Sequence, residues 1–343
     1  MTLKGAMKRL LFSLVIFWGV LGFFDLLAAE EAKEKPRCAS DKDCQKPGMR
    51  GVCQNPGQAT ASCIFQEVVT IDSIVIVPPG CRTCHAQDVA NSLQGIFPGM
   101  NAKYLEANDP QAKKLIRDLK IEMLPAYIFS RQFEKDPNFL QFRGIADLVN
   151  DHYYLKPSFA GVSYFVDRKM ERGKLNLFLL LTQKDALPVL KVAKELIDKK
   201  KDKIKFQINL VGRYDPETNV FLIPGGRREV NEERIYACVE QSHPQKVWDY
   251  LFCRLADIDS LWWEDCLREN AIPPQEIKEC ARGPEADQLI KEKIKLAEEL
   301  RISAAPLFLL DNVEIFGATE RSTSDEIIGI IDSKGNNIKK KKE

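Results

Sequence analysis

Residues 71–84 have the sequence Ile71-Asp72-Ser73-Ile74-Val75-Ile76-Val77, then Pro78-Pro79-Gly80, then Cys81-Arg82-Thr83-Cys84. A β-branched, apolar run of this length is typical of a buried strand, and the Pro-Pro-Gly turn ends it. The sequence after the second cysteine predicts a helix over residues 85–93. The cysteine pair is therefore expected at a strand-to-helix turn.

This position has a chemical consequence for the Cys81–Cys84 motif. The exposed N–H groups and the dipole at a helix N-terminus lower the pKa of a nearby thiol, because they favour the thiolate. Two cysteines at this spacing can also close into a small disulfide and open again. The motif thus has the geometry that thiol–disulfide exchange requires.

The first 29 residues predict export. Lys4, Lys8 and Arg9 precede an apolar stretch over residues 10–27, and Ala28-Ala29 follows it. This pattern is typical of a secretory signal peptide or a signal anchor. Cleavage is favoured because Asp25 weakens a stable membrane span. Retention as a membrane tether stays open, since the apolar stretch is near the length of a span.

Cysteine content agrees with export to a periplasm or to the outside of the cell. The chain has ten cysteines, which is ordinary for an oxidising compartment and high for a reducing one. They form three even groups: Cys38, Cys44, Cys53 and Cys63; Cys81 and Cys84; and Cys238, Cys253, Cys266 and Cys280. The net charge of +1 gives no reason to expect nucleic acid as a partner.

The first group lies in a small module over residues 36–66. The module is rich in turn-forming residues and too short to bury a sufficient apolar core, so two disulfides are its expected support. Four cysteines allow three connectivities, of which we favour Cys38–Cys53 with Cys44–Cys63. A metal site is the alternative; it is less favoured because no two of these cysteines are closely spaced.

A first large domain is expected over residues 68–167. After the motif come a strand over 102–106, a helix over 110–119 with Asp109 as its cap, and a strand over 121–129 that contains Pro125. Residues 138–142 are expected to add an edge strand, and residues 147–155 to close the domain.

The stretch 71–129 resembles thioredoxin, with Cys81-Arg82-Thr83-Cys84 as the redox motif. Leu124-Pro125 stands at the position of that family's cis-proline, and a cis X–Pro bond is rare enough to be a feature. The resemblance implies that Leu124 and Pro125 face the cysteine pair. It also implies that backbone groups there are free to dock an extended substrate.

The resemblance assigns roles to the residues of the motif. Cys81, the more exposed cysteine in this family, attacks a substrate cysteine as a thiolate, and Cys84 resolves the mixed disulfide. Arg82 or His85 favours the anion of Cys81. The family often has a buried carboxylate six residues before the first cysteine, where this chain has Val75. Exchange is therefore expected to be slower, or to use water or His85.

A second domain is expected over residues 172–333. Its predicted strands cover 174–181, 203–211, 302–310 and 313–317; its predicted helices cover 185–199 and 324–331. The proline-led strand again resembles thioredoxin, with Pro306 at the cis-proline position. A helical insertion over about 229–300 makes this half similar to the DsbA-like branch and to lysosomal-thiol-reductase-like relatives.

The second domain lacks a Cys-x-x-Cys pair near residues 183–186, so it is not expected to carry out exchange. Protein disulfide isomerases similarly combine active and silent thioredoxin domains. By that analogy the second domain holds substrate or pairs two protomers; a purely structural role is the alternative. The fold class is thus α/β, with two thioredoxin-like domains after a disulfide-rich module. A basic tail covers residues 334–343.

The cysteines of the insertion are interpreted as structural. Cys238 and Cys253 flank one predicted turn, and Cys266 and Cys280 flank another, so each pair is expected to link one helical hairpin.

The expected activity is thiol–disulfide exchange on protein cysteines, as oxidase, isomerase or reductase, with a partner that recycles the pair and with no cofactor. Three alternatives stay open. Cys81–His85 is also a CxxCH haem-attachment signature, with Met100 and Met123 as candidate axial ligands. Copper or zinc handling by Cys81, Cys84 and His85 is the second alternative. A non-enzymatic binding protein with a fixed disulfide is the third.

Overall fold

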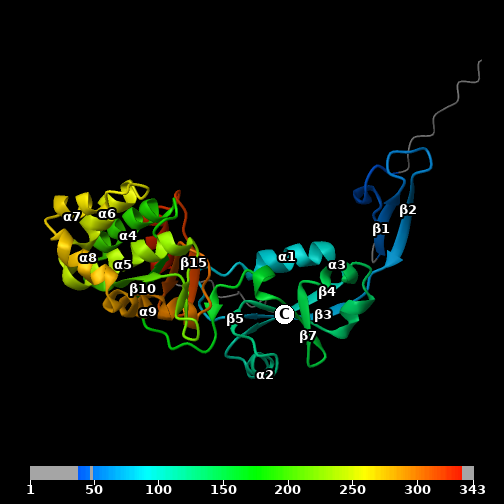
Figure 1. Ribbon diagram of the computed structural model, residues 1–343. Coiled ribbons are helices and arrows are strands. Elements are labelled where there is room, and N and C mark those ends of the chain that lie inside the picture. Colours follow the sequence, from blue (N-terminus) through cyan, green and yellow to red (C-terminus); the bar gives the residue numbers. More distant parts are fainter. Residues whose placement is uncertain (1–37, 47–48, 334–343) are drawn as a thin grey trace, which may run out of the picture. The chain divides into compact units, whose positions relative to one another are not determined.

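The computed structural model describes residues 38–46 and 49–333 (Figure 1). The predicted signal segment and the basic tail lie outside these residues. Within them, no helix is long and apolar enough to cross a membrane. The chain divides into two compact units, Met1–Glu67 and Val68–Glu343.

The small unit is an antiparallel pair of strands held by sulfur bridges. Its elements are η1 (Asp41–Asp43), β1 (Met49–Gln54) and β2 (Ser62–Glu67). Cys38 is bonded to Cys53 and Cys44 to Cys63, which confirms the favoured connectivity. Among residues 38–46 and 49–67, the buried hydrophobic cluster consists of three of these cysteines and Ala61, so the disulfides form most of it.

The N-terminal half of the large unit, residues 68–167, is built on a five-stranded sheet in the order β4-β3-β6-β8-β7. The strands are β3 (Ile71–Val77), β4 (Met100–Glu106), β6 (Ala126–Phe129), β7 (Ala146–Val149) and β8 (His152–Leu155). β3 is parallel to β4 and antiparallel to β6. This order and these directions confirm the expected thioredoxin fold.

Helices cover both faces of this sheet. Side chains of β3 point alternately to the two faces, so the strand packs against a helix on each side. Val75 packs with α1 (Ala86–Ile96), while Ile76 packs with α2 (Pro110–Asp118). The two helices accordingly lie on opposite sides of the strands in Figure 1. Asp109 accepts a hydrogen bond from the Gln111 N–H, as expected of a helix cap.

The prediction of an edge strand over residues 138–142 is wrong. This segment forms the short helix α3 (Phe139–Phe142), and the sheet edge is β7. A helical turn places Phe139 and Phe142 on one side, where both rings contact Phe133. In a strand these two residues would point to opposite faces.

The C-terminal half, residues 172–333, has the same core order in the sheet β11-β10-β14-β15-β9-β5. Its own strands are β10 (Lys174–Leu179), β11 (Lys205–Leu210), β14 (Leu307–Leu310) and β15 (Glu314–Gly317), with α4 (Ala186–Lys200) and α10 (Ser324–Asp332) as the expected helices. The last two strands come from the other half: β5 (Met123–Leu124) precedes Pro125, and β9 (Tyr164–Phe165) lies near its end. The sheet therefore joins the two halves.

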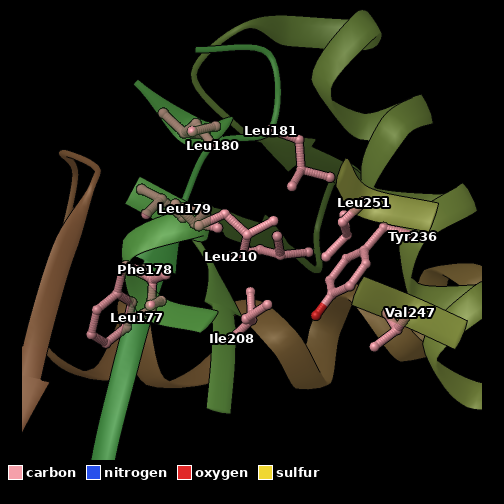
Figure 2. Packing of buried hydrophobic residues seen from close by; sticks show 14 of the residues in the cluster. Leu177, Phe178, Leu179, Leu180, Leu181, Ile208, Leu210, Tyr236, Val247 and Leu251 are labelled. Atoms are coloured by element: carbon pink, nitrogen blue, oxygen red, sulfur yellow. The ribbon is translucent and has the colours of Figure 1, made fainter. Parts of the chain in front are cut away.

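The expected helical insertion packs against this sheet. It consists of α5 (Gly226–Ser242), η5 (Pro244–Lys246), α6 (Val247–Ala256), α7 (Trp263–Glu269), α8 (Pro274–Arg282) and α9 (Pro284–Glu299). Figure 2 shows Leu210 and Ile208 of the sheet on the side of Tyr236 of α5 and Leu251 of α6, and all four belong to one buried cluster. A hairpin that the sequence did not predict, β12 (Arg213–Asp215) with β13 (Val220–Leu222), precedes these helices.

The predicted pairing of the insertion's cysteines is wrong, although all four are in disulfides. Cys238 is bonded to Cys280, and Cys253 to Cys266. The disulfides are therefore nested: one ties α5 to α8, and the other ties α6 to α7. Each links helices that pack together, rather than the two sides of one predicted turn.

Glu233 of α5 is a buried acid whose carboxyl group lacks hydrogen bonds to the residues that the structure describes. It is fully buried, and neither of its carboxyl oxygens has a hydrogen-bond partner among the residues that the structure describes. Burial raises the pKa of Glu233 well above its usual value, and the nearby charge of Glu229 raises it further. The folded protein thus keeps this proton to a higher pH than the unfolded chain does.

Glu233→Gln is expected to stabilise the protein at neutral and alkaline pH. Above the ordinary pKa of a glutamate the wild-type folded state binds more protons than the unfolded state, so its stability falls as pH rises. Glutamine does not titrate, so the variant does not lose stability in this way. Relative to wild type, its free energy of unfolding should rise by about 1.4 kcal/mol per pH unit until the pH reaches the folded-state pKa of Glu233. Urea unfolding at several pH values measures this, with the exposed Glu292→Gln as control. Parallel stability curves for wild type and variant would contradict it.

Candidate redox site

The motif lies between β3 and α1, as predicted. Cys81 and Cys84 form a disulfide, and α1 begins two residues after Cys84. The buried Tyr127 hydroxyl of β6 donates to the Ala86 carbonyl at 3.1 Å, which fixes the start of α1 against the sheet. The buried Tyr127 thus helps to fix the Cys81–Cys84 disulfide between β3 and α1.

The two sulfurs differ in exposure, in the opposite sense to that implied by the resemblance. Cys81 is 3% exposed, whereas Cys84 is partly exposed. Cys81 is covered because two residues from outside the motif, Ser163 and Glu314, contact its sulfur.

The Leu124–Pro125 peptide bond is cis, and so is Ala305–Pro306 in the second half. The Leu124 carbonyl accepts a hydrogen bond from the Ser163 N–H at 2.8 Å. The Ser163 hydroxyl oxygen lies 3.2 Å from the Cys84 sulfur and 3.7 Å from the Cys81 sulfur. Ser163 thus connects the cis-proline segment to the disulfide, so the structure brings these predicted site residues together.

Glu314 of β15 reaches the motif from the C-terminal half. One carboxylate oxygen accepts hydrogen bonds from the N–H groups of Arg82 and Thr83, each at 2.7 Å, and from the Thr83 hydroxyl at 2.9 Å. The same oxygen lies 3.4 Å from the Cys81 sulfur. Glu314 is 2% exposed, so the motif meets a buried carboxylate that comes from the C-terminal half and not from position 75.

Arg82 is directed at acids rather than at the sulfurs. Its guanidinium lies 2.9 Å from the Asp311 carboxylate and 3.6 Å from that of Glu314. Asp311 in turn accepts a hydrogen bond from the Gly173 N–H at 2.7 Å. Because two carboxylates share this guanidinium, its charge is largely balanced before any thiolate forms at Cys81.

The remaining predicted residues lie farther from the chemistry. The His85 side chain is 78% exposed and lies 3.6 Å from the Asp88 carboxylate. Met100 is buried at the start of β4, and Met123 lies in β5. Both cysteines of the haem-attachment signature are bonded to each other in this structure.

The C-terminal half has a comparable loop after its first strand, without cysteines. There Glu229 of α5 accepts hydrogen bonds from the Leu181 N–H, the Thr182 N–H and the Thr182 hydroxyl. The loop of each half thus offers two N–H groups and a threonine hydroxyl to a buried carboxylate. Burial raises the pKa of Glu229.

Sequence reasoning did not identify Ser163 or Glu314 as site residues. Ser163 follows the last predicted element of the first domain, in a stretch without a motif. Glu314 gave one usable signal, since it is an acid within the expected buried strand 313–317.

Comparisons with known proteins found similar solved structures but no similar sequence. Neither a protein-family model nor a curated protein matches the chain. Among solved structures it is similar to BdbD from Bacillus subtilis, at 17% identity over 47% of this chain and 86% of that one, with a TM-score of 0.37. Oxidoreductase DsbA from Xylella fastidiosa is 10% identical over 50% and 94%, with a TM-score of 0.39. The thiol-disulfide exchange protein alpha-DsbA2 from Wolbachia pipientis is 14% identical over 48% and 83%, with a TM-score of 0.37.

These TM-scores are low, so the thioredoxin fold of both halves rests on strand order and strand direction. In the N-terminal half the placement of the Cys81–Cys84 disulfide adds to this.

Proposed function

We propose that the protein is an exported thiol–disulfide oxidoreductase that acts on protein cysteines through Cys81 and Cys84. One observation carries the proposal: the disulfide adjoins the cis Leu124–Pro125 segment, whose backbone already binds an extended strand. That strand directs a side chain at both sulfurs. A substrate cysteine in the same place would be within reach of the disulfide.

In the oxidising direction, a substrate thiolate attacks the Cys81 sulfur and the Cys81–Cys84 bond breaks. Cys84 leaves as a thiolate and takes up a proton. A second substrate thiolate then attacks the substrate sulfur of the mixed disulfide and releases Cys81, so the substrate loses two electrons and the pair gains them. Reduction of a substrate disulfide is the reverse. A partner that exchanges two electrons with the pair completes the cycle.

The C-terminal half does not exchange thiols in this proposal, because the loop after β10 has no cysteine. Its contribution is to the surroundings of Cys81, through Glu314 and Asp311. Export, by cleavage of the signal segment or with it kept as a tether, places the protein where disulfides are stable.

A redox titration tests the proposal. The protein is equilibrated with mixtures of oxidised and reduced glutathione, and free thiols are counted by mass after alkylation while the visible spectrum is recorded. We expect one colourless pair that cycles at a defined potential and is lost in Cys81→Ser. A pair that never cycles would leave a binding protein, and a haem absorption band would favour the electron-carrier alternative.

A further inference from the structure

We propose that residues 163–166, which we call the inserted strand, are a built-in pseudosubstrate. In this arrangement the inserted strand occupies the edge on which protein substrates dock, and it must be displaced before Cys81 exchanges with them. The inference rests on the proposed function and concerns its regulation and its substrates.

The inserted strand is bonded on both sides. Toward the N-terminal half, the N–H groups of Ser163 and Val166 donate to the carbonyls of Leu124 at 2.8 Å and Glu122 at 3.0 Å. Toward the C-terminal half, the Phe165 N–H donates to the Val313 carbonyl at 2.8 Å, and the Ser163 carbonyl accepts from the Ile315 N–H at 2.8 Å. A strand added to a sheet edge in this way is a general mode of peptide recognition.

The register of the inserted strand sets Ser163 at the disulfide. Leu124 pairs with Tyr164, and Met123 with Phe165, so the hydroxyl of the preceding Ser163 faces both sulfurs. Serine has the shape of cysteine without its reactivity, because a hydroxyl does not form a disulfide. A segment of another protein that followed the same path would present its cysteine at this point.

The packing of the inserted strand describes the substrate class. Tyr164 and Val166 contact the apolar cluster of the N-terminal half that contains Ile76 and Leu124, while Phe165 is buried in the C-terminal core. An external substrate gains the first set of contacts if it is extended and has apolar or aromatic residues one and three places after its cysteine. A compact, charged segment would not make these apolar contacts.

A cross-link tests the geometry. In a Cys84→Ser background, Ser163→Cys brings a second thiol to Cys81; oxidised glutathione accepts their two electrons and two protons, which yields a disulfide and two reduced glutathiones. Tryptic mass mapping is expected to find positions 81 and 163 joined. The control is Val162→Cys in the same background, since the neighbouring side chain of an extended chain points the other way.

The outcomes of the cross-link are distinct. With Val162→Cys we expect Cys81 to carry glutathione instead of an internal link. Equal internal links in the two variants, or none with Ser163→Cys, would overturn the proposal.

A rate measurement tests displacement. The probe is a reduced peptide that copies residues 160–168 with Ser163→Cys; two peptide thiols reduce one Cys81–Cys84 disulfide and leave as a peptide disulfide. Ser163→Pro removes the N–H that binds Leu124, which is worth roughly 1 kcal/mol, so we expect reduction to be roughly two- to tenfold faster. Ser163→Ala is the matched control, because it removes the same hydroxyl but keeps that N–H; we expect Ser163→Pro to react faster than Ser163→Ala by this factor.

An unchanged rate in a Ser163→Pro variant with a native circular dichroism spectrum would overturn the proposal. If that variant does not fold, the cross-link between positions 81 and 163 is the test of the proposal. Failure of the proposed function is separate: it is a wild-type pair that does not cycle with glutathione, whatever the inserted strand does.

Discussion

Replacing Cys84 with serine is expected to leave substrate proteins covalently attached to Cys81. Exchange passes through a mixed disulfide, and the second cysteine of the pair is the group that releases it. Without Cys84 only an external thiol resolves the intermediate, and this bimolecular step is slower than attack by a sulfur already held beside the bond. The attached fraction should rise from nearly none in wild type to most of the protein.

The measurement is non-reducing electrophoresis and mass spectrometry of Cys84→Ser after expression in an exporting host. Cys81→Ser is the matched control, and we expect it to trap little. The reverse pattern, with substrates attached in Cys81→Ser, would show that Cys84 is the attacking sulfur. That result would agree with the greater exposure of Cys84 in this structure.

Local patterns in the sequence predicted the parts of the site that lie close together along the chain. The β-branched run forms β3, and the motif follows it at the turn before α1. The cis bond at Leu124–Pro125 and the pairing of Cys38 with Cys53 were also predicted. The strand, the turn and the disulfide depend on residues that are close along the chain, whereas the cis bond was predicted from the resemblance to thioredoxin.

Contacts between distant residues could not be predicted in this way. Glu314 meets Cys81 across 233 residues, and Ser163 meets it across 82. Both contacts depend on how the two halves share one sheet, and no periodicity or motif encodes that sharing. The pairing of Cys238 with Cys280 failed for a similar reason, since helix packing rather than turn position determines it.

Glu314→Gln is expected to make the Cys81–Cys84 pair more oxidising. A carboxylate 3.4 Å from the Cys81 sulfur opposes formation of a thiolate there, because like charges in a buried site repel. Glu314 also takes the N–H groups of Arg82 and Thr83 that would otherwise favour that thiolate. Glutamine keeps the shape and removes the charge, so the reduced form gains stability.

Two further observations agree with this role of the charge at Glu314. The carboxylate of Glu314 adds to the effect of burial in raising the pKa of the nearby Tyr164 hydroxyl, so it already disfavours an anion beside it. In the other half, Glu229 binds the same kind of donors where no sulfur competes. The loop thus binds the carboxyl group of a glutamate in both halves, and in the N-terminal half a thiolate at Cys81 would compete with it for the same donors.

The measurements are the glutathione equilibrium and the ultraviolet absorbance of the thiolate against pH. We expect Glu314→Gln to lower the pKa of the Cys81 thiol and to shift the equilibrium about tenfold toward the dithiol, which is about 30 mV for this two-electron couple. Glu326→Gln is the control, since Glu326 caps α10 through the Thr323 N–H and leaves the motif untouched. A merely structural role for Glu314 would alter unfolding but leave the potential and the thiolate titration as in wild type. A shift toward the disulfide would show instead that Glu314 stabilises the reduced pair, as a proton acceptor for Cys81.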